Sequence, residues 1–251
     1  GGCEPMSKSA EKAVLYRMVM DDHICPFGLK SRHLLKSEGY EVEDNWLTTR
    51  EQTDAFKREH QVDTTPQTFL GGRRVGGYDD LKRHFGKGKN EGETSYTPVV
   101  AVFAMAAAMA LAATWAAFGT VVTIRSVEWF IAISMCILAV LKLRDISSFS
   151  NTFLGYDLVA QRYVPYAYFY PFGEALAGVL MIAGALLWIA IPVALVIGTI
   201  GAISVFKAVY IDKRDLKCAC VGGNSNVPLG FVSLTENVMM VAMALWMMRM
   251  L

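Results

Sequence analysis

The sequence lacks the features of several common classes of protein. Its 24 Lys and Arg residues are balanced by 23 Asp and Glu residues, so the net charge is only +1. Nucleic-acid-binding proteins usually carry a strong basic excess, so we expect no nucleic-acid partner. Five cysteines are an unsuitable, odd number for a framework of structural disulfides, which favours reactive thiols. These cysteines are Cys3, Cys25, Cys136, Cys218 and Cys220.

Histidine and charge are scarce in the second part of the chain. All four histidines precede residue 85, so a Cys/His zinc site later in the chain has no ligands, and we expect no metal. Residues 1–96 hold 31 of the 47 charged residues, and residues 97–251 hold only 16. This division predicts a soluble domain followed by a membrane domain.

The first twenty residues also lack the pattern of a secretory signal, which has a basic start, an apolar core and a small-residue cleavage site. We therefore expect the N-terminal domain to stay in the cytosol.

Short apolar and alternating segments predict an α/β domain near the N-terminus. The order of its predicted elements, βαβαββα, is that of the thioredoxin fold. The expected strands are residues 12–19, 40–46, 67–70 and 73–75, and the expected helices are residues 29–37, 50–60 and 78–85.

Three short motifs stand in the connections of this domain. They are Cys25-Pro26-Phe27-Gly28, Thr64-Thr65-Pro66-Gln67 and Gly76-Gly77-Tyr78-Asp79. Cys25 lies where a strand meets a helix, so the helix N-terminus would stabilise its thiolate. The bond between Thr65 and Pro66 is a usual place for a cis peptide, and Gly76-Gly77 allows close approach of the backbone.

In this order the motifs resemble a monothiol-type glutaredoxin over about residues 12–86. The resemblance implies that Cys25 forms a mixed disulfide with glutathione, which is the implied cofactor. Gly28 stands where dithiol members have a second cysteine. Some monothiol members hold an iron–sulfur cluster, but Pro26 argues against one here. The implied glutathione-binding residues are Arg17, which departs from the usual Lys, and Phe27, Thr65, Pro66, Gly77, Tyr78 and Asp79.

Apolar segments in the second part predict an all-α polytopic membrane domain of five helices. Each segment is long enough to span a hydrocarbon layer of ~30 Å at a rise of ~1.5 Å per residue. The expected domains are residues 1–86, a linker at 87–97, and 98–251. The expected helices are residues 98–124, 127–143, 171–191, 192–211 and 228–251.

Loop charges predict the orientation of these helices. Lys142, Arg144 and Arg162 follow the second helix, and residues 213–217 supply three more basic residues after the fourth. The alternate connections hold only Arg125 and, at the chain end, Arg249. The positive-inside rule therefore predicts a multi-pass protein of the inner membrane with a cytosolic glutaredoxin domain and an external C-terminus. Four tyrosines at 163–170 are typical of a membrane interface.

Two further motifs lie near the C-terminus: Lys217-Cys218-Ala219-Cys220-Val221-Gly222-Gly223 and Ser233-Leu234-Thr235-Glu236-Asn237. With the four-helix pattern of residues 127–251, they resemble the MauE family, related to DoxX-type membrane proteins. The resemblance implies thiol redox chemistry at a membrane. A disulfide across one intervening residue departs from relaxed geometry and is easily reduced, which favours an exchanging pair over metal-binding or unpaired cysteines.

Ionisable residues inside membrane helices are costly and usually functional. Glu174, Lys207 and Glu236 are predicted to lie in the cytosolic half of the membrane domain, and Asn237 adds a hydrogen-bonding group. Two interpretations stay open: these residues pair with one another, or they line a pocket for the charged ends of glutathione.

The two halves together predict a membrane-embedded, glutathione-dependent thiol–disulfide oxidoreductase. Cys25 would exchange glutathione or electrons with Cys218 and Cys220, and the membrane domain would pass reducing equivalents or a glutathionyl group outward. The expected partners are glutathione, the lipid bilayer and a periplasmic thiol protein. A transporter of glutathione or its conjugates, or a maturation factor for a periplasmic enzyme, are the alternatives. Because Cys136 is mid-helix and no cysteine is expected on the outer side, glutathione itself is a candidate for the moving species.

Overall fold

The computed structural model describes residues 11–21, 23–88, 94–221 and 226–251. The chain forms two compact units, Gly1–Glu91 and Gly92–Leu251. Their boundary falls within the predicted linker at 87–97, of which residues 89–93 lie outside the described residues.

The first unit is built on a four-stranded sheet in the order β2-β1-β3-β4. Its central strand β1 is parallel to β2 and antiparallel to β3, which in turn pairs antiparallel with β4. The strands are β1 (Lys12–Met18), β2 (Glu41–Leu47), β3 (Gln67–Leu70) and β4 (Arg73–Gly76).

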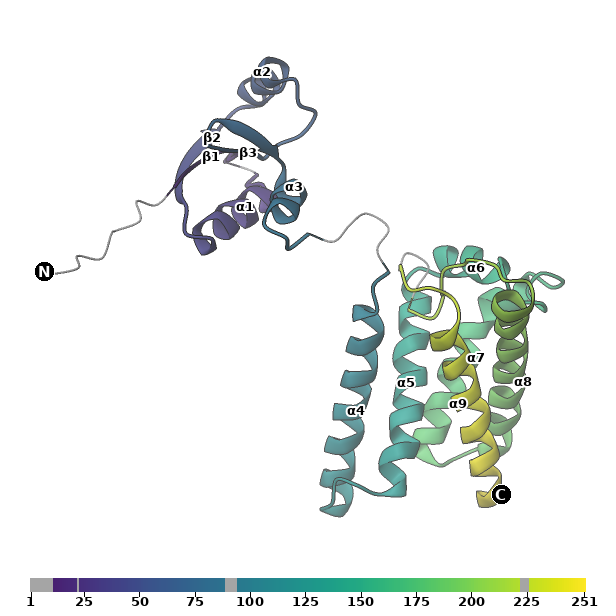
Figure 1. Cartoon of the computed structure of the whole chain (residues 1–251). Helices are drawn as coiled ribbons and strands as arrows, with labels where there is room; N and C mark the ends of the chain where they lie inside the picture. Colours follow the sequence, from purple (N-terminus) through teal and green to yellow (C-terminus); the bar gives the residue numbers. More distant parts are fainter. Residues whose placement is uncertain (1–10, 22, 89–93, 222–225) are drawn as a thin grey trace, which may run out of the picture. The chain divides into compact units, whose positions relative to one another are not determined.

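Helices cover both faces of this sheet (Figure 1), because alternate residues of β1 point to opposite faces. Leu15 packs with Leu35 and Leu81, which belong to α1 (Pro26–Ser37) and α3 (Tyr78–His84). Its neighbour Tyr16 instead packs beside Phe56 of α2 (Arg50–His60). The predicted element order βαβαββα is confirmed.

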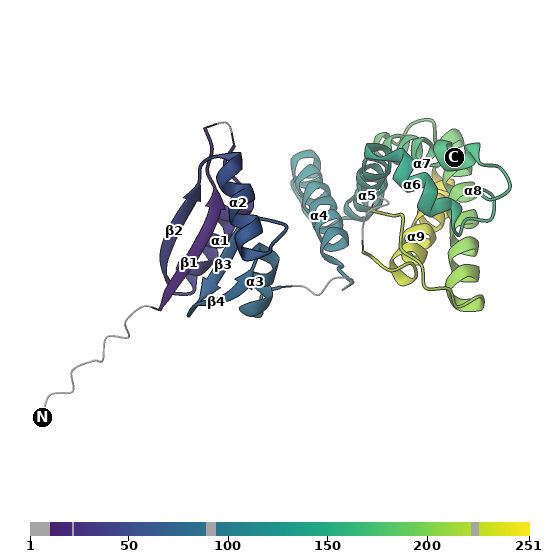
Figure 2. The same ribbon diagram turned by 90° about the horizontal axis from the view of Figure 1, so that it is seen from above.

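The second unit is a helical bundle. Along it, α4 packs against α5, α5 against α7, α7 against α8, and α8 against α9. Seen along the bundle in Figure 2, α4 stands at its edge beside α5. The helices are α4 (Thr97–Phe118), α5 (Ile124–Arg144), α6 (Ile146–Leu154), α7 (Pro165–Ala183), α8 (Leu187–Phe206) with the π-helix η1 (Lys207–Ile211), and α9 (Phe231–Met247) with the 3₁₀ turn η2 (Met248–Met250).

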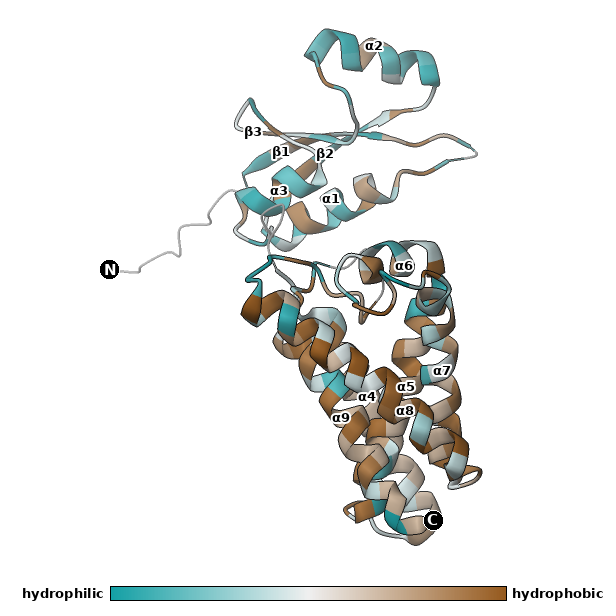
Figure 3. Ribbon diagram, turned by 90° about the vertical axis from the view of Figure 1, so that its right-hand side faces the viewer, coloured by the Kyte–Doolittle hydropathy of each residue, from teal (hydrophilic) through white to brown (hydrophobic). Residues whose placement is uncertain are grey.

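Four helical segments of the described chain are long and apolar enough to cross a membrane, so the prediction of five is wrong by this measure. They are Thr97–Phe118, Ile124–Arg144, Leu187–Ile211 and Phe231–Met250. In Figure 3 these helices are largely brown, whereas α2 of the first unit is mostly teal. The helix left out is α7, because its tyrosines, Pro171 and Glu174 lower its hydropathy, although it packs between α5 and α8.

The predicted bounds of the third and fourth membrane helices, 171–191 and 192–211, are also wrong. α7 begins six residues earlier, with Pro165 at its first position, and ends where Gly184 adopts a left-handed conformation at φ 63°. Pro171 and Pro192 both lie inside helices. The sequence interpretation placed each proline at a helix start, but apolar helices tolerate internal proline where neighbouring groups satisfy the freed carbonyls.

Candidate functional site

Cys25 occupies the cap position of α1 and is a buried, free cysteine. Its backbone N–H donates to the Met18 carbonyl at 3.2 Å, and its carbonyl accepts from the Leu29 N–H at 3.2 Å. Pro26 takes the first helical position, where no N–H partner is needed. The strand end and the helix start thus fix Cys25 at the positive end of the α1 dipole, as the sequence predicts.

Four of the residues predicted to bind glutathione come together near the start of α1. The bond between Thr65 and Pro66 is cis. A Cβ added to Gly77 would lie 3.6 Å from the Pro66 carbonyl oxygen. The rings of Phe27 and Tyr78 have centroids 6.3 Å apart. The cis-proline loop and the starts of α1 and α3 are therefore neighbours, and their role toward glutathione stays a prediction.

Arg17 makes a different contact from the one its predicted role requires. Its Nε and one terminal nitrogen donate to the two Asp44 carboxylate oxygens at 2.7 and 2.8 Å, and the residue is 3% exposed. Partial burial of Asp44 opposes its ionisation, but these bonds hold the pKa of its carboxyl below the usual value. The Arg17 guanidinium is thus held by Asp44 of β2, and a role of Arg17 toward glutathione stays a prediction.

Asp79 and its neighbour Asp80 divide two tasks at the start of α3. Asp80, not Asp79, accepts the Gly77 N–H at 3.1 Å and so caps the helix. The Asp79 side chain is 78% exposed and lies 3.2 Å from the Lys82 ammonium. Asp79 is thus exposed and does not cap the helix, and its predicted role toward glutathione stays a prediction.

Gly28 of α1 lies close to Arg17 of β1. A Cβ at this position would lie 2.7 Å from Arg17 Cβ and 3.0 Å from its Cδ. The side chain of the second cysteine found in dithiol glutaredoxins would overlap Arg17. The packing of Arg17 seen here therefore leaves room only for glycine at position 28.

In the second unit, Cys218 and Cys220 form a disulfide and are both buried. The Cys218 N–H donates to the Val227 carbonyl at 2.8 Å, which closes the loop before α9. The pair packs against Val99 and Val102 of α4 and Leu138 of α5. This predicted pair is therefore enclosed by the bundle.

Below this loop lies a buried ion triad. The Lys142 ammonium is 2.7 Å from a Glu174 carboxylate oxygen and 2.8 Å from one of Glu236. All three side chains are at most 6% exposed. The predicted member Lys207 is absent from it, because its ammonium pairs with Asp212 at 2.7 Å on the surface. Lys142, which was interpreted from the sequence as a loop charge, takes the place of Lys207. The prediction that Lys207 belongs to the cluster is therefore wrong.

One small cavity of about 10 Å³ joins the disulfide to the triad, enough for about one water molecule. Asn237 also lines it, and its amide donates to the Ser233 carbonyl at 2.7 Å. The structure thus brings Cys220, Glu236 and Asn237 to one site, with Glu174 one ion pair away. The lining residues are Lys142, Phe149, Phe153, Tyr156, Tyr170, Gly201, Cys220, Ser233, Glu236 and Asn237.

Two tyrosines of this lining were missed by the sequence interpretation. Tyr170, expected at a membrane interface, is buried with its ring centroid 5.4 Å from the Lys142 ammonium. Tyr156 stacks edge-on against Phe153, which also contacts Tyr170. Burial, followed by the nearby Glu236 and Asp157 charges, raises the pKa of Tyr156 well above its usual value, so it is a neutral hydrogen-bonding group. Tyr163 and Tyr168 are exposed, and their place at a membrane interface stays a prediction.

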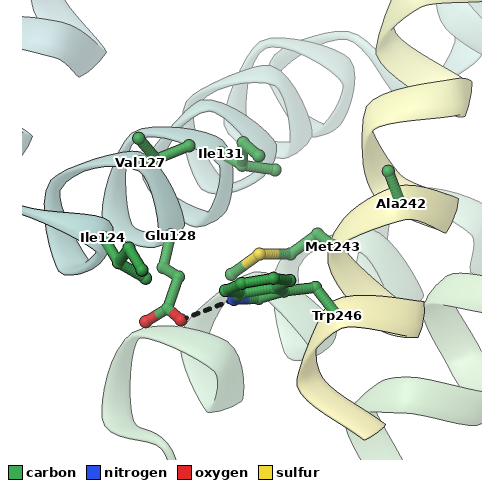
Figure 4. Close-up of a pocket in the computed structure, with 7 residues that line it drawn as sticks. All are labelled: Ile124, Val127, Glu128, Ile131, Ala242, Met243 and Trp246. Atoms are coloured by element: carbon green, nitrogen blue, oxygen red, sulfur yellow. Dashed lines mark hydrogen bonds between the residues drawn. The ribbon is translucent and has the colours of Figure 1, made fainter. Parts of the chain in front are cut away.

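A second pocket, of about 370 Å³, lies between α5 and α9 near the C-terminus (Figure 4). Its wall is apolar except for Glu128, which is 2% exposed. One Glu128 oxygen accepts from the Trp246 indole at 2.8 Å, and the other is 2.8 Å from Arg125. Arg249 lies over the Trp246 ring, 3.2 Å from its centroid. No sequence prediction concerned Glu128, whose contacts fasten α5 to the end of α9.

Among the residues that the structure describes, no group of three or more His, Cys, Asp and Glu side chains is arranged to hold a metal ion.

Comparison with known proteins identifies the membrane part. The family profile for methylamine utilisation protein MauE matches residues 116–250, more than half of the chain, and the chain belongs to this family. The match supports the predicted redox-associated membrane domain. A 61-residue stretch is 34% identical to the hybrid peroxiredoxin hyPrx5 of Haemophilus influenzae. It covers 24% of this chain, which spans about a quarter of that protein. No solved structure matches the chain.

These findings fit a thiol redox protein of the membrane with a thioredoxin-like part. The narrower glutaredoxin assignment, and with it the use of glutathione, stays a prediction.

Proposed function

We propose that this protein is a membrane-embedded, glutathione-dependent thiol–disulfide oxidoreductase in which Cys25 exchanges with Cys218 and Cys220. The observation that carries the proposal is the presence of two thiol centres in one chain. One is a free cysteine at a helix N-terminus, and the other is a disulfide beside a buried ion triad. Membership of the MauE family and the similarity to a hybrid peroxiredoxin support a redox role.

The first unit would act as a monothiol-type glutaredoxin of thioredoxin fold. Phe27, Pro66, Gly77 and Tyr78 offer a surface beside the start of α1, and the Lys30 ammonium lies 5.6 Å from the Phe27 ring centroid. Aromatic rings and an ammonium suit a small peptide that ends in carboxylates, such as glutathione. Gly28 leaves no thiol beside Cys25 to resolve a mixed disulfide, so resolution would fall to another thiol.

The membrane unit would supply that second thiol pair. A covalent tether between two reacting modules raises their effective concentration to the millimolar range. Thiol–disulfide exchange needs direct contact of sulfur atoms through a mixed disulfide. Fusion of the two units would thus favour exchange between Cys25 and the pair over reaction with separate proteins.

The orientation that suits this exchange has the disulfide loop in the cytosol, the compartment proposed for the first unit. Arg144 ends α5 at that end of the bundle, and Arg162 and the basic residues at 213–217 lie in the connections there. At the other end Arg125 and Arg249 both pair with Glu128, which offsets part of their charge. In this orientation, a tag inserted near residue 157 should score as cytosolic.

Transport of glutathione or a conjugate is the second candidate. Cys136 is the remaining cysteine of the bundle and lies mid-helix in α5, next to Gly178 of α7. A relay made of cysteines alone would therefore stop at the disulfide, and glutathione itself would have to carry sulfur chemistry to the other side.

One vesicle experiment tests both candidates. The full chain is reconstituted into vesicles, and a fluorogenic disulfide and labelled reduced glutathione are added outside. Faster reduction of the disulfide outside without entry of label supports the oxidoreductase, whereas entry of label supports transport. Equal signals from wild type, Cys25→Ser and the Cys218→Ser/Cys220→Ser double variant would refute the proposal.

A further inference from the structure

We infer that the Cys218–Cys220 disulfide reacts asymmetrically: an incoming thiolate attacks Cys220, and Cys218 departs as the thiolate. This inference rests on the proposed function and specifies which sulfur does what.

Three neighbours favour negative charge on Cys218. The Ser233 hydroxyl lies 2.8 Å from Cys218 Sγ, and a disulfide sulfur carries no proton, so the hydroxyl donates. The backbone N–H of Cys220 also donates to Cys218 Sγ, at 3.0 Å. Ser233 is in the first turn of α9, whose N-terminus carries partial positive charge. Hydrogen bonds to the charged form of a thiol favour that form.

The surroundings of Cys220 have the opposite character. Cys220 lines the small cavity together with Glu236, and Cys218 is not among its lining residues. The triad on that side contains one ammonium and two carboxyl groups, so it offers no surplus positive charge to a thiolate. A negative charge that develops when the disulfide opens is therefore better placed on Cys218.

The exchange balances without another reactant. An incoming thiolate forms a bond to Cys220 Sγ, the Sγ–Sγ bond breaks, and its electron pair passes to Cys218 Sγ. A second thiolate then attacks the sulfur bound to Cys220 and releases Cys220 as a thiolate. The two incoming thiols leave as an oxidised disulfide, and the reduced pair takes up two protons from solvent. Since both cysteines are buried, the first attack needs movement of the surrounding side chains.

The test is to locate the first mixed disulfide. The full chain, with its disulfide oxidised, is mixed in detergent with reduced glutathione and quenched in acid within the first turnover. The remaining thiol is alkylated, and mass spectrometry of peptides assigns each adduct. We expect glutathione on Cys220 and the alkyl group on Cys218.

Ser233 provides the matched variants. Ser233→Ala removes one donor to a charged sulfur and should slow opening of the disulfide by about tenfold or more. It should also shift part of the glutathione to Cys218, which a merely structural role would not do. Ser233→Thr keeps the hydroxyl and should recover most of the rate and the original site.

The possible results distinguish failure of the proposed order of attack from failure of the proposed function. Glutathione found mainly on Cys218 in the wild type would overturn the order of attack and leave the proposed function intact. A disulfide that glutathione and Cys25 both fail to open would overturn the order and the proposed function together.

Discussion

The buried triad predicts a large difference between two lysine substitutions that look alike in sequence. Lys142→Met removes the one ammonium that compensates Glu174 and Glu236, which are 0% and 6% exposed as side chains. Breaking a buried pair by removing one partner costs about 3–5 kcal/mol, because a buried charge is left uncompensated. Lys207→Met removes a lysine whose side chain is 47% exposed and pairs with Asp212. Exposed ion pairs contribute only about 0–1 kcal/mol.

The thermal midpoint of the bundle is the quantity to measure. For a unit of this size, about 1 kcal/mol shifts the midpoint by about 2–4 °C. Lys142→Met should therefore lower it by about 6–20 °C, and Lys207→Met by less than about 4 °C. Unfolding is followed in detergent with a thiol-reactive fluorophore that reports exposure of Cys136, which is half-buried between α5 and α7. Cys3 and Cys25 are replaced by Ser so that they do not contribute.

A neutral triad separates loss of charge balance from loss of packing. Lys142→Met combined with Glu174→Gln and Glu236→Gln removes all three charges and should recover much of the lost stability. Equal midpoints for Lys142→Met and Lys207→Met, or no recovery in the triple variant, would refute the argument that the triad is a compensated buried charge cluster.

Three further predictions concern single positions. Because the folded state lowers the Asp44 pKa, its stabilisation is present above about pH 4 and is lost as the pH falls through the folded-state value. Asp44→Asn should remove this acid-dependent step, read from amide hydrogen exchange in β1 and β2. Gly28→Ala should destabilise the first unit by about 1–3 kcal/mol through overlap with Arg17, whereas Gly77→Ala should cost less than about 1 kcal/mol, both measured by hydrogen exchange. Gly201→Ala would place a Cβ 2.1 Å from the Asn237 amide oxygen and should lower the bundle midpoint, whereas Gly173→Ala, 3.5 Å from Val193, should be tolerated.

The order of strands and helices in the first unit could be predicted because the sequence motifs that mark them are local. Period-two alternation marks β1, and Cys25-Pro26 and Gly76-Gly77 mark the two turns that open α1 and α3. The Arg17 contact did not follow, because its partner Asp44 is reached only through the register in which Leu15 pairs with Asp44 across β1 and β2. The residues that lie opposite a given strand residue depend on the register between the two strands. The sequence of each strand alone does not specify that register.

The ion triad was half anticipated, for a reason visible in the helices. Met135, Leu138 and Lys142 succeed one another at spacings of three and four residues, so Lys142 lies on the buried face of α5. This periodicity could have identified it. Lys207 falls where α8 changes from an α-helix to the π-helix η1. That change rotates the following side chains away from the face expected from a regular helix. The position of each lysine along its predicted membrane helix could not by itself distinguish Lys142 from Lys207.

Helix α4 packs on the disulfide although it lies largely outside the region that matches the family. The match begins at residue 116, so nearly all of α4 lies outside it, yet Val99 and Val102 of α4 pack on Cys218 and Cys220. The segment that joins the first unit to the family domain thus also covers the thiol pair. If Val99 and Val102 limit access to the disulfide, Val99→Ala/Val102→Ala removes buried methyl groups that pack on it. Glutathione should then reduce the disulfide several-fold faster. Met105→Ala/Met109→Ala, on the exposed side of the same helix, is the matched control and should leave the rate unchanged. Equal rates for both double variants would mean that access is set by the loop before α9 and by Ser233, and that α4 serves only to connect the two units.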